Sequence, residues 1–195
     1  MGDVDGDRDL DIVFANKDGQ NRLYVNDGSG VFEDVTLTHF PEDHDNSRGM
    51  ALGDVDGDGD LDFMFAHRSG QNRLYLNDGS GVFSDATEIR FPTYSDWSLD
   101  VALGDVDADR DLDILVANFT GQNELYLNDG SGVFENATAT HLPADSDSSL
   151  GIALGDVDGD GDLDVIVANF GDNRLYTNQG GHSVPFGLVG CEFHP

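Results

Sequence analysis

The chain has 195 residues, enough for one domain or for several small modules that share a core. It carries 39 acidic residues against 9 lysines and arginines, a formal net charge of -30. Such a charge disfavours nucleic acids and anionic membranes as partners. The apolar runs are only about four residues long, so we expect no membrane insertion, and Cys191 alone can form no internal disulfide or cysteine-ligated zinc site.

An internal repeat organises almost the whole chain. Gly-Asp-Val-Asp begins at Gly2, Gly53, Gly104 and Gly155, with a constant spacing of 51 residues. The repeats give blade 1 over 1–52, in which the innermost strand is missing, blade 2 over 53–103, blade 3 over 104–154 and a truncated blade 4 over 155–181. The segment 182–195 lies outside the repeat.

Each repeat is expected to form four short strands. A strand of small and apolar residues, as in 150–155, precedes an aspartate loop, and the β-branched and aromatic run 11–16 follows such a loop. A third run over 21–26 and the turn Asp27-Gly28-Ser29-Gly30 lead to a fourth run over 31–36. Four antiparallel strands in a unit of about 40–50 residues are typical of a β-propeller blade. We therefore expect an all-β protein of four tandem blades, either an incomplete or a four-bladed propeller.

The aspartate loops predict a metal site in every blade. Positions 1, 3, 5 and 9 of a nine-residue loop carry carboxylates that converge if the chain curls tightly, and position 7 can offer its backbone carbonyl. All-oxygen ligation of this kind suits Ca²⁺. An EF-hand is excluded because its position 12, occupied here by Phe14, Phe65, Val116 and Val167, would need a glutamate. The alternative, a set of merely solvated acidic hairpins, leaves the concentration of carboxylates unexplained.

Two features resemble the FG-GAP/VCBS repeat family: the aspartate loops and the run Asn-Arg-Leu-Tyr-Leu-Asn-Asp-Gly-Ser-Gly-Val-Phe. The Ca²⁺ loop of this family also occurs in the integrin α-subunit propeller. The resemblance covers roughly residues 2–181 and implies one Ca²⁺ at each loop, about four per chain. The implied carboxylate ligands are Asp3, Asp5, Asp7 and Asp11; Asp54, Asp56, Asp58 and Asp62; Asp105, Asp107, Asp109 and Asp113; and Asp156, Asp158, Asp160 and Asp164. The implied carbonyl ligands are those of Asp9, Asp60, Asp111 and Asp162.

The loops depart from the family pattern at three positions. Arg8 and Arg110 replace the glycine at position 6, and Ala108 replaces the glycine at position 4. Because glycine is used where φ is positive, we expect these residues to be strained.

The links 41–48, 92–98 and 143–149 differ most between repeats, and variable loops on a repeated scaffold often carry recognition. Among them, Arg48, Tyr94 and Trp97 are candidate ligand-binding residues, although an inert exposed Trp97 is an equal alternative. The polar turns at Gln20-Asn21, Gln71-Asn72 and Gln122-Asn123 are expected to cap themselves. The recurrent tyrosines are expected in the core, and the six histidines, which show no metal-ligand spacing, at the surface.

The function that these features favour is a calcium-binding module, extracellular or at the cell surface, that binds a protein or a glycan in adhesion. Met1 leads directly into the first repeat, so we expect no signal peptide in this segment. No enzymatic activity is expected, because the loops are dispersed one per blade and cationic residues are few. The alternatives are a Ca²⁺-dependent propeller that hydrolyses phosphate esters and a structural spacer of a larger surface protein. Self-association is expected if the propeller is incomplete.

Overall fold

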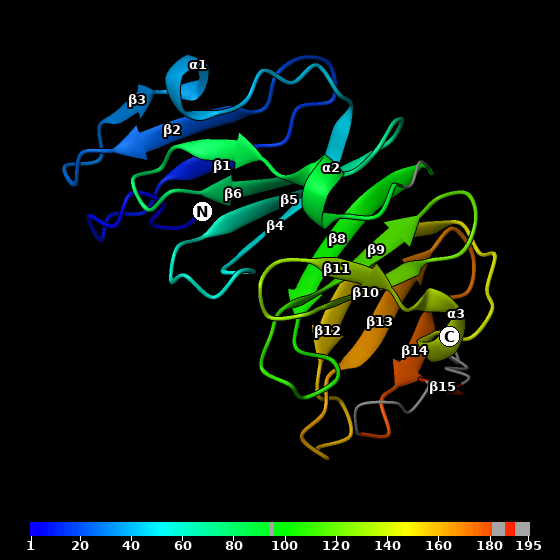
Figure 1. The fold of residues 1–195 in the computed structure, drawn as a ribbon. Coiled ribbons are helices and arrows are strands. Elements are labelled where there is room, and N and C mark those ends of the chain that lie inside the picture. The colour runs from blue at the N-terminus through cyan, green and yellow to red at the C-terminus, as the bar shows by residue number, and fades with distance from the viewer. Residues whose placement is uncertain (94–95, 181–185, 190–195) are drawn as a thin grey trace.

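The computed structural model describes residues 1–93, 96–180 and 186–189, and these form four antiparallel sheets in a row (Figure 1). In each sheet the strands are neighbours in sequence order. The strands are β1 Ile12–Phe14, β2 Arg22–Asn26 and β3 Phe32–Asp34; β4 Ser47–Gly53, β5 Asp62–His67, β6 Arg73–Asn77 and β7 Phe83–Asp85; β8 Ser98–Gly104, β9 Asp113–Asn118, β10 Glu124–Asn128 and β11 Phe134–Asn136; β12 Ser149–Gly155, β13 Asp164–Asn169, β14 Arg174–Thr177 and β15 Gly187–Val189. The predicted all-β fold of propeller blades is confirmed.

The sheets are offset from the 51-residue units counted in the sequence. The inner strand β4 precedes the aspartate loop, so the second sheet runs from Ser47 to Asp85, whereas the sequence unit runs over 53–103. The first sheet has three strands, and a single bridge between Gly2 and Asp11 stands in the place of its inner strand.

The fourth sheet is completed from beyond the repeat. β15 pairs with β14 at the outer position, with Tyr176 opposite Leu188. The part 187–189 of the non-repeat segment therefore serves as the outer strand of the fourth sheet. Residues 181–185 and 190–195, which include the rest of the predicted non-repeat segment, lie outside the described residues.

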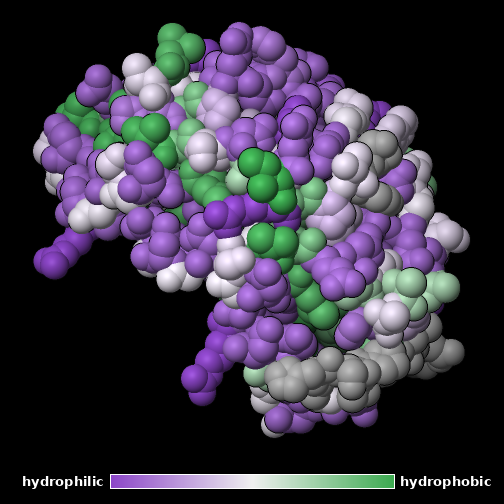
Figure 2. All heavy atoms as spheres, in the orientation of Figure 1, coloured by the Kyte–Doolittle hydropathy of each residue, from purple (hydrophilic) through white to green (hydrophobic). Residues whose placement is uncertain are grey.

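Three apolar clusters lie between successive sheets. Blade 1 contributes Val4, Val13 and Leu23 to the first cluster, where they pack against aromatic residues of blade 2. Equivalent clusters join blade 2 to blade 3 and blade 3 to blade 4. Tyr75 and Tyr126 are almost fully buried, as expected. The visible surface is mostly hydrophilic, with hydrophobic residues in a few islands (Figure 2).

One-turn helices follow the outer strand of the first three blades: α1 Thr36–His39, α2 Thr87–Arg90 and α3 Thr138–His141. They were not predicted, because four residues are too few to show helical periodicity. The first threonine of each helix fixes the turn. In blade 2, the Thr87 hydroxyl accepts a hydrogen bond from the Leu74 N–H, and the Thr87 N–H donates to Asp85. No helix among the described residues is long and apolar enough to cross a membrane.

Candidate metal centres and ligand surface

Each aspartate loop brings three carboxylates together at one end of its blade. In blade 2 the loop starts at Gly53, which pairs with Asp62, so the chain leaves and re-enters the sheet at adjacent positions. One carboxylate oxygen from each member lies within 4.8 Å of the others in every group. The groups are Asp3, Asp5 and Asp11; Asp54, Asp56 and Asp58; Asp105, Asp107 and Asp113; and Asp156, Asp158 and Asp164.

Backbone donors hold the loops in this curled form. The position-1 carboxylate of Asp54 accepts hydrogen bonds from the N–H groups of Gly57 at 2.8 Å and Gly59 at 3.0 Å. The position-9 carboxylate of Asp62 is buried and accepts from Val55 at 3.0 Å and Asn77 at 2.9 Å. The same pair of bonds recurs at the position-9 residues Asp11, Asp113 and Asp164.

The other predicted ligands lie outside these groups of side chains. At position 5, Asp7, Asp109 and Asp160 are absent from the groups, and so is Asp62 at position 9 of the second loop. The position-7 residues are Asp9, Asp60, Asp111 and Asp162. Each of these carboxylates packs against a glycine in the Asp-Gly or Gln-Gly turn of the same blade, as Asp60 packs against Gly79. Position 7 therefore turns its side chain away, as a residue would that offers only its backbone carbonyl.

An asparagine that sequence reasoning missed ties each of the last three loops to the preceding blade. The Nδ2 group of Asn77 donates to the Val4 carbonyl at 2.8 Å and to the Leu61 carbonyl at 3.2 Å. Asn128 and Asn178 make the same pair of bonds one and two blades later. The signal in the sequence was the recurrence of asparagine at the end of the run 21–26 and at its equivalents, Asn77, Asn128 and Asn178.

Burial and mutual repulsion act against ionisation of the loop carboxylates. Burial is the main cause that raises the pKa of Asp62 to about 6 and the pKa of Asp113 to about 7. Burial, followed by repulsion from Asp58, also raises the pKa of Asp56, and burial followed by repulsion from Asp109 raises that of Asp107. A bound cation would relieve both effects, and the all-oxygen donor set fits Ca²⁺.

The predicted strain in two of the loops is confirmed. Arg8 has φ of 77°, Arg110 has φ of 83° and Ala108 has φ of 63°, all in the left-handed region. The equivalents of the two arginines in the second and fourth loops are Gly59 and Gly161, both at φ of 97°. The third loop therefore holds two strained residues and the first holds one.

The opposite end of the blades carries the candidate ligand surface. Ser47 pairs with His67 at the end of the β4–β5 ladder remote from the aspartate loop, and Arg48 and Arg68 are their neighbours in the chain. Arg48, Arg68, Trp97, Leu99 and Phe119 line a pocket of about 210 Å³. The structure thus brings the predicted residues Arg48 and Trp97 together, whereas Tyr94 lies outside the described residues.

Two contacts shape this pocket. Trp97 is 41% exposed, and its ring stacks on Phe119 with a centroid separation of 6.1 Å. The Arg68 guanidinium lies 4.7 Å from the centroid of the Trp97 ring, within range of a cation–π interaction. Arg68 and Phe119 were not predicted, because their positions next to Trp97 depend on the packing of blade 2 against blade 3.

The asparagine side chains of the polar turns beside this surface bond to the backbone of their own turns, as expected. The side-chain oxygen of Asn21 accepts from the Asn16 N–H at 2.8 Å, and Asn72 and Asn123 do the same in the next two blades. The expectation that the histidines lie at the surface is wrong for His67, which is 0% exposed. The close packing of β5 between two blades buries it.

A family model for the FG-GAP-like repeat matches residues 3–65, 54–116 and 105–167. The chain belongs to the FG-GAP-like repeat family. The three matches are spaced by one repeat, and each begins at the first aspartate of a loop and ends in the strand after the next loop. The FG-GAP-like unit therefore contains the aspartate loops described above.

Among curated proteins, the chain is similar to cartilage acidic protein 1. It is 30% identical over 171 residues to the proteins of Mus musculus and Homo sapiens, and 28% identical over 175 residues to that of Xenopus tropicalis. The matches cover 82% of this chain and 26% of each relative, so the chain spans about a quarter of their length.

Among solved structures, the chain is similar to an Agrocybe aegerita lectin described as recognising non-reducing terminal N-acetylglucosamine. The TM-score is 0.52 at 20% sequence identity, and the match covers 98% of this chain and 51% of the lectin. This likeness supports the propeller fold.

Proposed function

We propose that the chain is an extracellular calcium-binding module that binds a glycan or a protein ligand in adhesion. The observation that carries the calcium assignment is the convergence of three carboxylates in four equivalent loops. A single acidic cluster is common without a metal, but four copies built by the same hydrogen bonds are a repeated donor set of hard oxygen ligands.

In each loop the carboxylates at positions 1, 3, 5 and 9 and the carbonyl at position 7 would hold the ion. Ca²⁺ would neutralise charge that repels within the loop and would lock the curled conformation. Aspartate loops of moderate affinity suit the millimolar Ca²⁺ outside cells. The name of the vertebrate relatives refers to cartilage, which agrees with this location.

The test is to titrate the chelator-treated chain with Ca²⁺ by calorimetry. We expect about four ions per chain, and one fewer after Asp156→Ala, which removes the position-1 ligand of the fourth loop. Failure to take up Ca²⁺ at millimolar concentration would refute the calcium assignment.

The pocket of Arg48, Arg68, Trp97 and Phe119 is the proposed ligand site. The exposed part of the Trp97 ring can pack against a sugar ring, and two guanidinium groups can bind a carboxylate or sulfate. Two arginines side by side are unusual on a chain with 9 basic residues, so an acidic glycan is the ligand that this surface favours. The Agrocybe lectin illustrates that a protein of similar fold recognises a sugar.

A screen of acidic and neutral glycans on an array, in Ca²⁺, tests this site. Trp97→Ala should abolish binding of any glycan that the wild type retains. Phe170→Ala is the matched control, because Phe170 is 80% exposed and occupies the position of Phe119 in blade 4, away from the pocket. Equal losses in the two variants, or no glycan retained, would contradict a glycan site here.

A further inference from the structure

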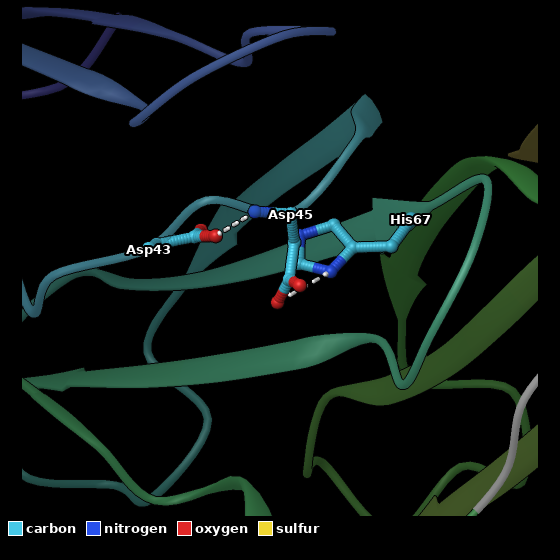
Figure 3. A group of neighbouring side chains, drawn as sticks. All are labelled: Asp43, Asp45 and His67. Atoms are coloured by element: carbon cyan, nitrogen blue, oxygen red, sulfur yellow. Dashed lines mark hydrogen bonds and ion pairs between the residues drawn. The ribbon is translucent and has the colours of Figure 1, made fainter.

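A second kind of site lies at the end of blade 2 remote from the aspartate loop. Asp43 and Asp45 come from the link before β4, and His67 ends β5. One ligand atom of each lies within 4.8 Å of the others, and the imidazole lies beside the two carboxylates (Figure 3). Asp43 is 5% exposed and His67 is 0% exposed, whereas the side chain of Asp45 is 28% exposed and gives solvent access.

The imidazole presents an unused lone pair in this group. Its Nδ1 atom lies 3.0 Å from the Gln71 carbonyl and 3.4 Å from Asp45 Oδ2, both of which accept, so Nδ1 carries the hydrogen. The other nitrogen, Nε2, is then a lone-pair donor. It is buried and has no hydrogen-bond partner, and it is turned toward the side on which Asp43 lies (Figure 3).

Other unsatisfied polar atoms belong to the same segment. Asn46 Oδ1, Ser47 Oγ and Gln71 Nε2 are buried without a partner, as is His67 Nε2. Asn46 and Ser47 follow Asp45 in the chain, and Gln71 bonds to His67 through its backbone. A buried polar atom without a partner costs roughly 1–3 kcal/mol, so their concentration here indicates a missing ligand.

Comparison with the other blades shows what His67 changes. Its position is taken by asparagine elsewhere, namely Asn16, Asn118 and Asn169. Each asparagine donates from Nδ2 to the carbonyl of the following turn, the bond that His67 makes from Nδ1. In blades 3 and 4 the asparagine oxygen also accepts from the inner-strand serine, Ser98 or Ser149. In blade 2 the equivalent serine, Ser47, is left without this bond.

The two carboxylates are oriented by a surrounding set of donors. Asp43 Oδ2 accepts from the Tyr75 hydroxyl at 3.0 Å and from Asn21 Nδ2 at 2.9 Å. Asp45 Oδ2 accepts from Arg73 Nε at 2.8 Å. In metal sites, groups that hydrogen-bond to the ligands in this way fix the orientation of those ligands.

The charge of this network also favours a cation. Arg73 is shared between Asp45 and Asp85, whose carboxylate lies 3.3 Å from Arg73 Nη1. With Asp43, which bonds to Tyr75 and Asn21, the network holds three carboxylates and one guanidinium. The excess of two negative charges equals the charge of one divalent ion.

We propose that Asp43, Asp45 and His67 form a site for a divalent transition-metal ion, with Zn²⁺ as the probe. The imidazole nitrogen distinguishes it from the aspartate loops, because nitrogen ligands suit Zn²⁺ and its neighbours, whereas purely carboxylate and carbonyl sites suit Ca²⁺. The site binds one ion through two carboxylates and one imidazole, with solvent completing the shell on the exposed side of Asp45.

The test is calorimetric titration of the Ca²⁺-loaded chain with Zn²⁺ in excess Ca²⁺. We expect one equivalent in the wild type and an affinity at least tenfold lower in His67→Asn. This substitution preserves the fold, because asparagine is the residue of the other three blades and restores an acceptor for Ser47. The melting temperature of the variant in Ca²⁺ should therefore not fall. No uptake of Zn²⁺, or equal uptake by the variant, would overturn the proposal and leave buried water as the ligand.

Blade 4 offers a gain-of-function experiment. The hydrogen bonds that orient the two carboxylates in blade 2 recur in blade 4, where Tyr176 donates to Asp145 and Arg174 donates to Asp147. Asn169 stands there in the place of His67. Asn169→His should raise the stoichiometry from one Zn²⁺ to two, and Co²⁺ should report the new site in its visible absorption spectrum. An unchanged stoichiometry would contradict the assigned ligand set.

Discussion

The strained arginine of the third loop allows the loop conformation to be tested by exchange with glycine. Arg110 is exposed, has φ of 83° and makes no side-chain hydrogen bond or ion pair among the described residues. A left-handed conformation costs a non-glycine residue roughly 1–2 kcal/mol. Glycine loses about 0.5–1 kcal/mol more backbone entropy on folding. Arg110→Gly should therefore raise the free energy of unfolding by about 0.5–1 kcal/mol, which corresponds to roughly 1–4 °C in melting temperature.

The assay is thermal unfolding in saturating Ca²⁺, with two comparison variants. Arg110→Ala keeps the Cβ atom and its strain but removes the charge, so it should not gain this stability. Gly59→Arg installs the reverse change in the second loop, where a Cβ would meet nothing within 4 Å, and should lose a similar amount. If Arg110→Gly were no more stable than Arg110→Ala, the backbone would not be strained as the φ angle indicates.

Three further outcomes follow from the loops. Removal of Ca²⁺ by a chelator should lower the melting temperature by about 10 °C or more, because four sites of roughly 0.1 mM affinity in 1 mM Ca²⁺ contribute about 6 kcal/mol. Asp58→Asn should reproduce part of this loss. In chelator, the melting temperature should fall as pH rises from 5 to 7.5. The pKa values of Asp62 and Asp113 are raised to about 6 and about 7, so the folded state binds more protons than the unfolded state in this window. A melting temperature that does not change with pH would contradict these raised pKa values. Asn128→Ala should cost about 2–4 kcal/mol in urea unfolding, because it leaves the buried Val55 carbonyl and the part-buried Leu112 carbonyl without this donor. A loss below 1 kcal/mol would show that the tie between blades contributes little.

The repeat was enough to predict the strands, the loops and the convergence of their carboxylates. A 51-residue period fixes which residues are equivalent, and hydrophobic alternation fixes which face is buried. It could not show that β15 completes the fourth blade, because Gly187–Val189 lacks the Gly-Val-Phe pattern of the other outer strands. Backbone pairing with β14 holds this segment in place, together with the burial of Phe186 in the cluster between blades 3 and 4.

The cluster of Asp43, Asp45 and His67 was missed for a different reason. Its members are up to 24 residues apart in the chain, and only the pairing of Ser47 with His67 brings the link and β5 together. The one available signal was the single histidine at a position where the other repeats have asparagine. A comparison of repeats position by position, rather than a search for ligand spacing, would have singled it out.

The two end blades expose faces that the inner blades bury. Val157 and Ile166 of blade 4 are 47% and 42% exposed, whereas their equivalents in blade 1, Val4 and Val13, are at most 8% exposed because blade 2 covers them. With Leu175 they line an apolar pocket of about 190 Å³. Blade 4 therefore presents the surface that accepts a following blade.

Blade 1 presents the complementary surface. Phe14 and Phe32 are 52% and 41% exposed, but their equivalents Phe65 and Phe83 in blade 2 are buried against the preceding blade. The two open faces thus match as successive blades match within the chain. In the isolated chain the available partner is a second copy, which can pack its blade 1 on blade 4 of the first in a head-to-tail contact.

Two copies joined in this way at both ends would form a closed ring of eight blades, within the range of known propellers. We therefore expect a dimer by sedimentation velocity in Ca²⁺. Ile166→Asp should dissociate it by placing a charge on the open face of blade 4. Ile89→Asp is the matched control, because Ile89 is 85% exposed on α2 and takes no part in either face, so it should leave the dimer intact. A monomeric wild type at tens of micromolar, or equal dissociation by both variants, would refute the complementarity of the end blades.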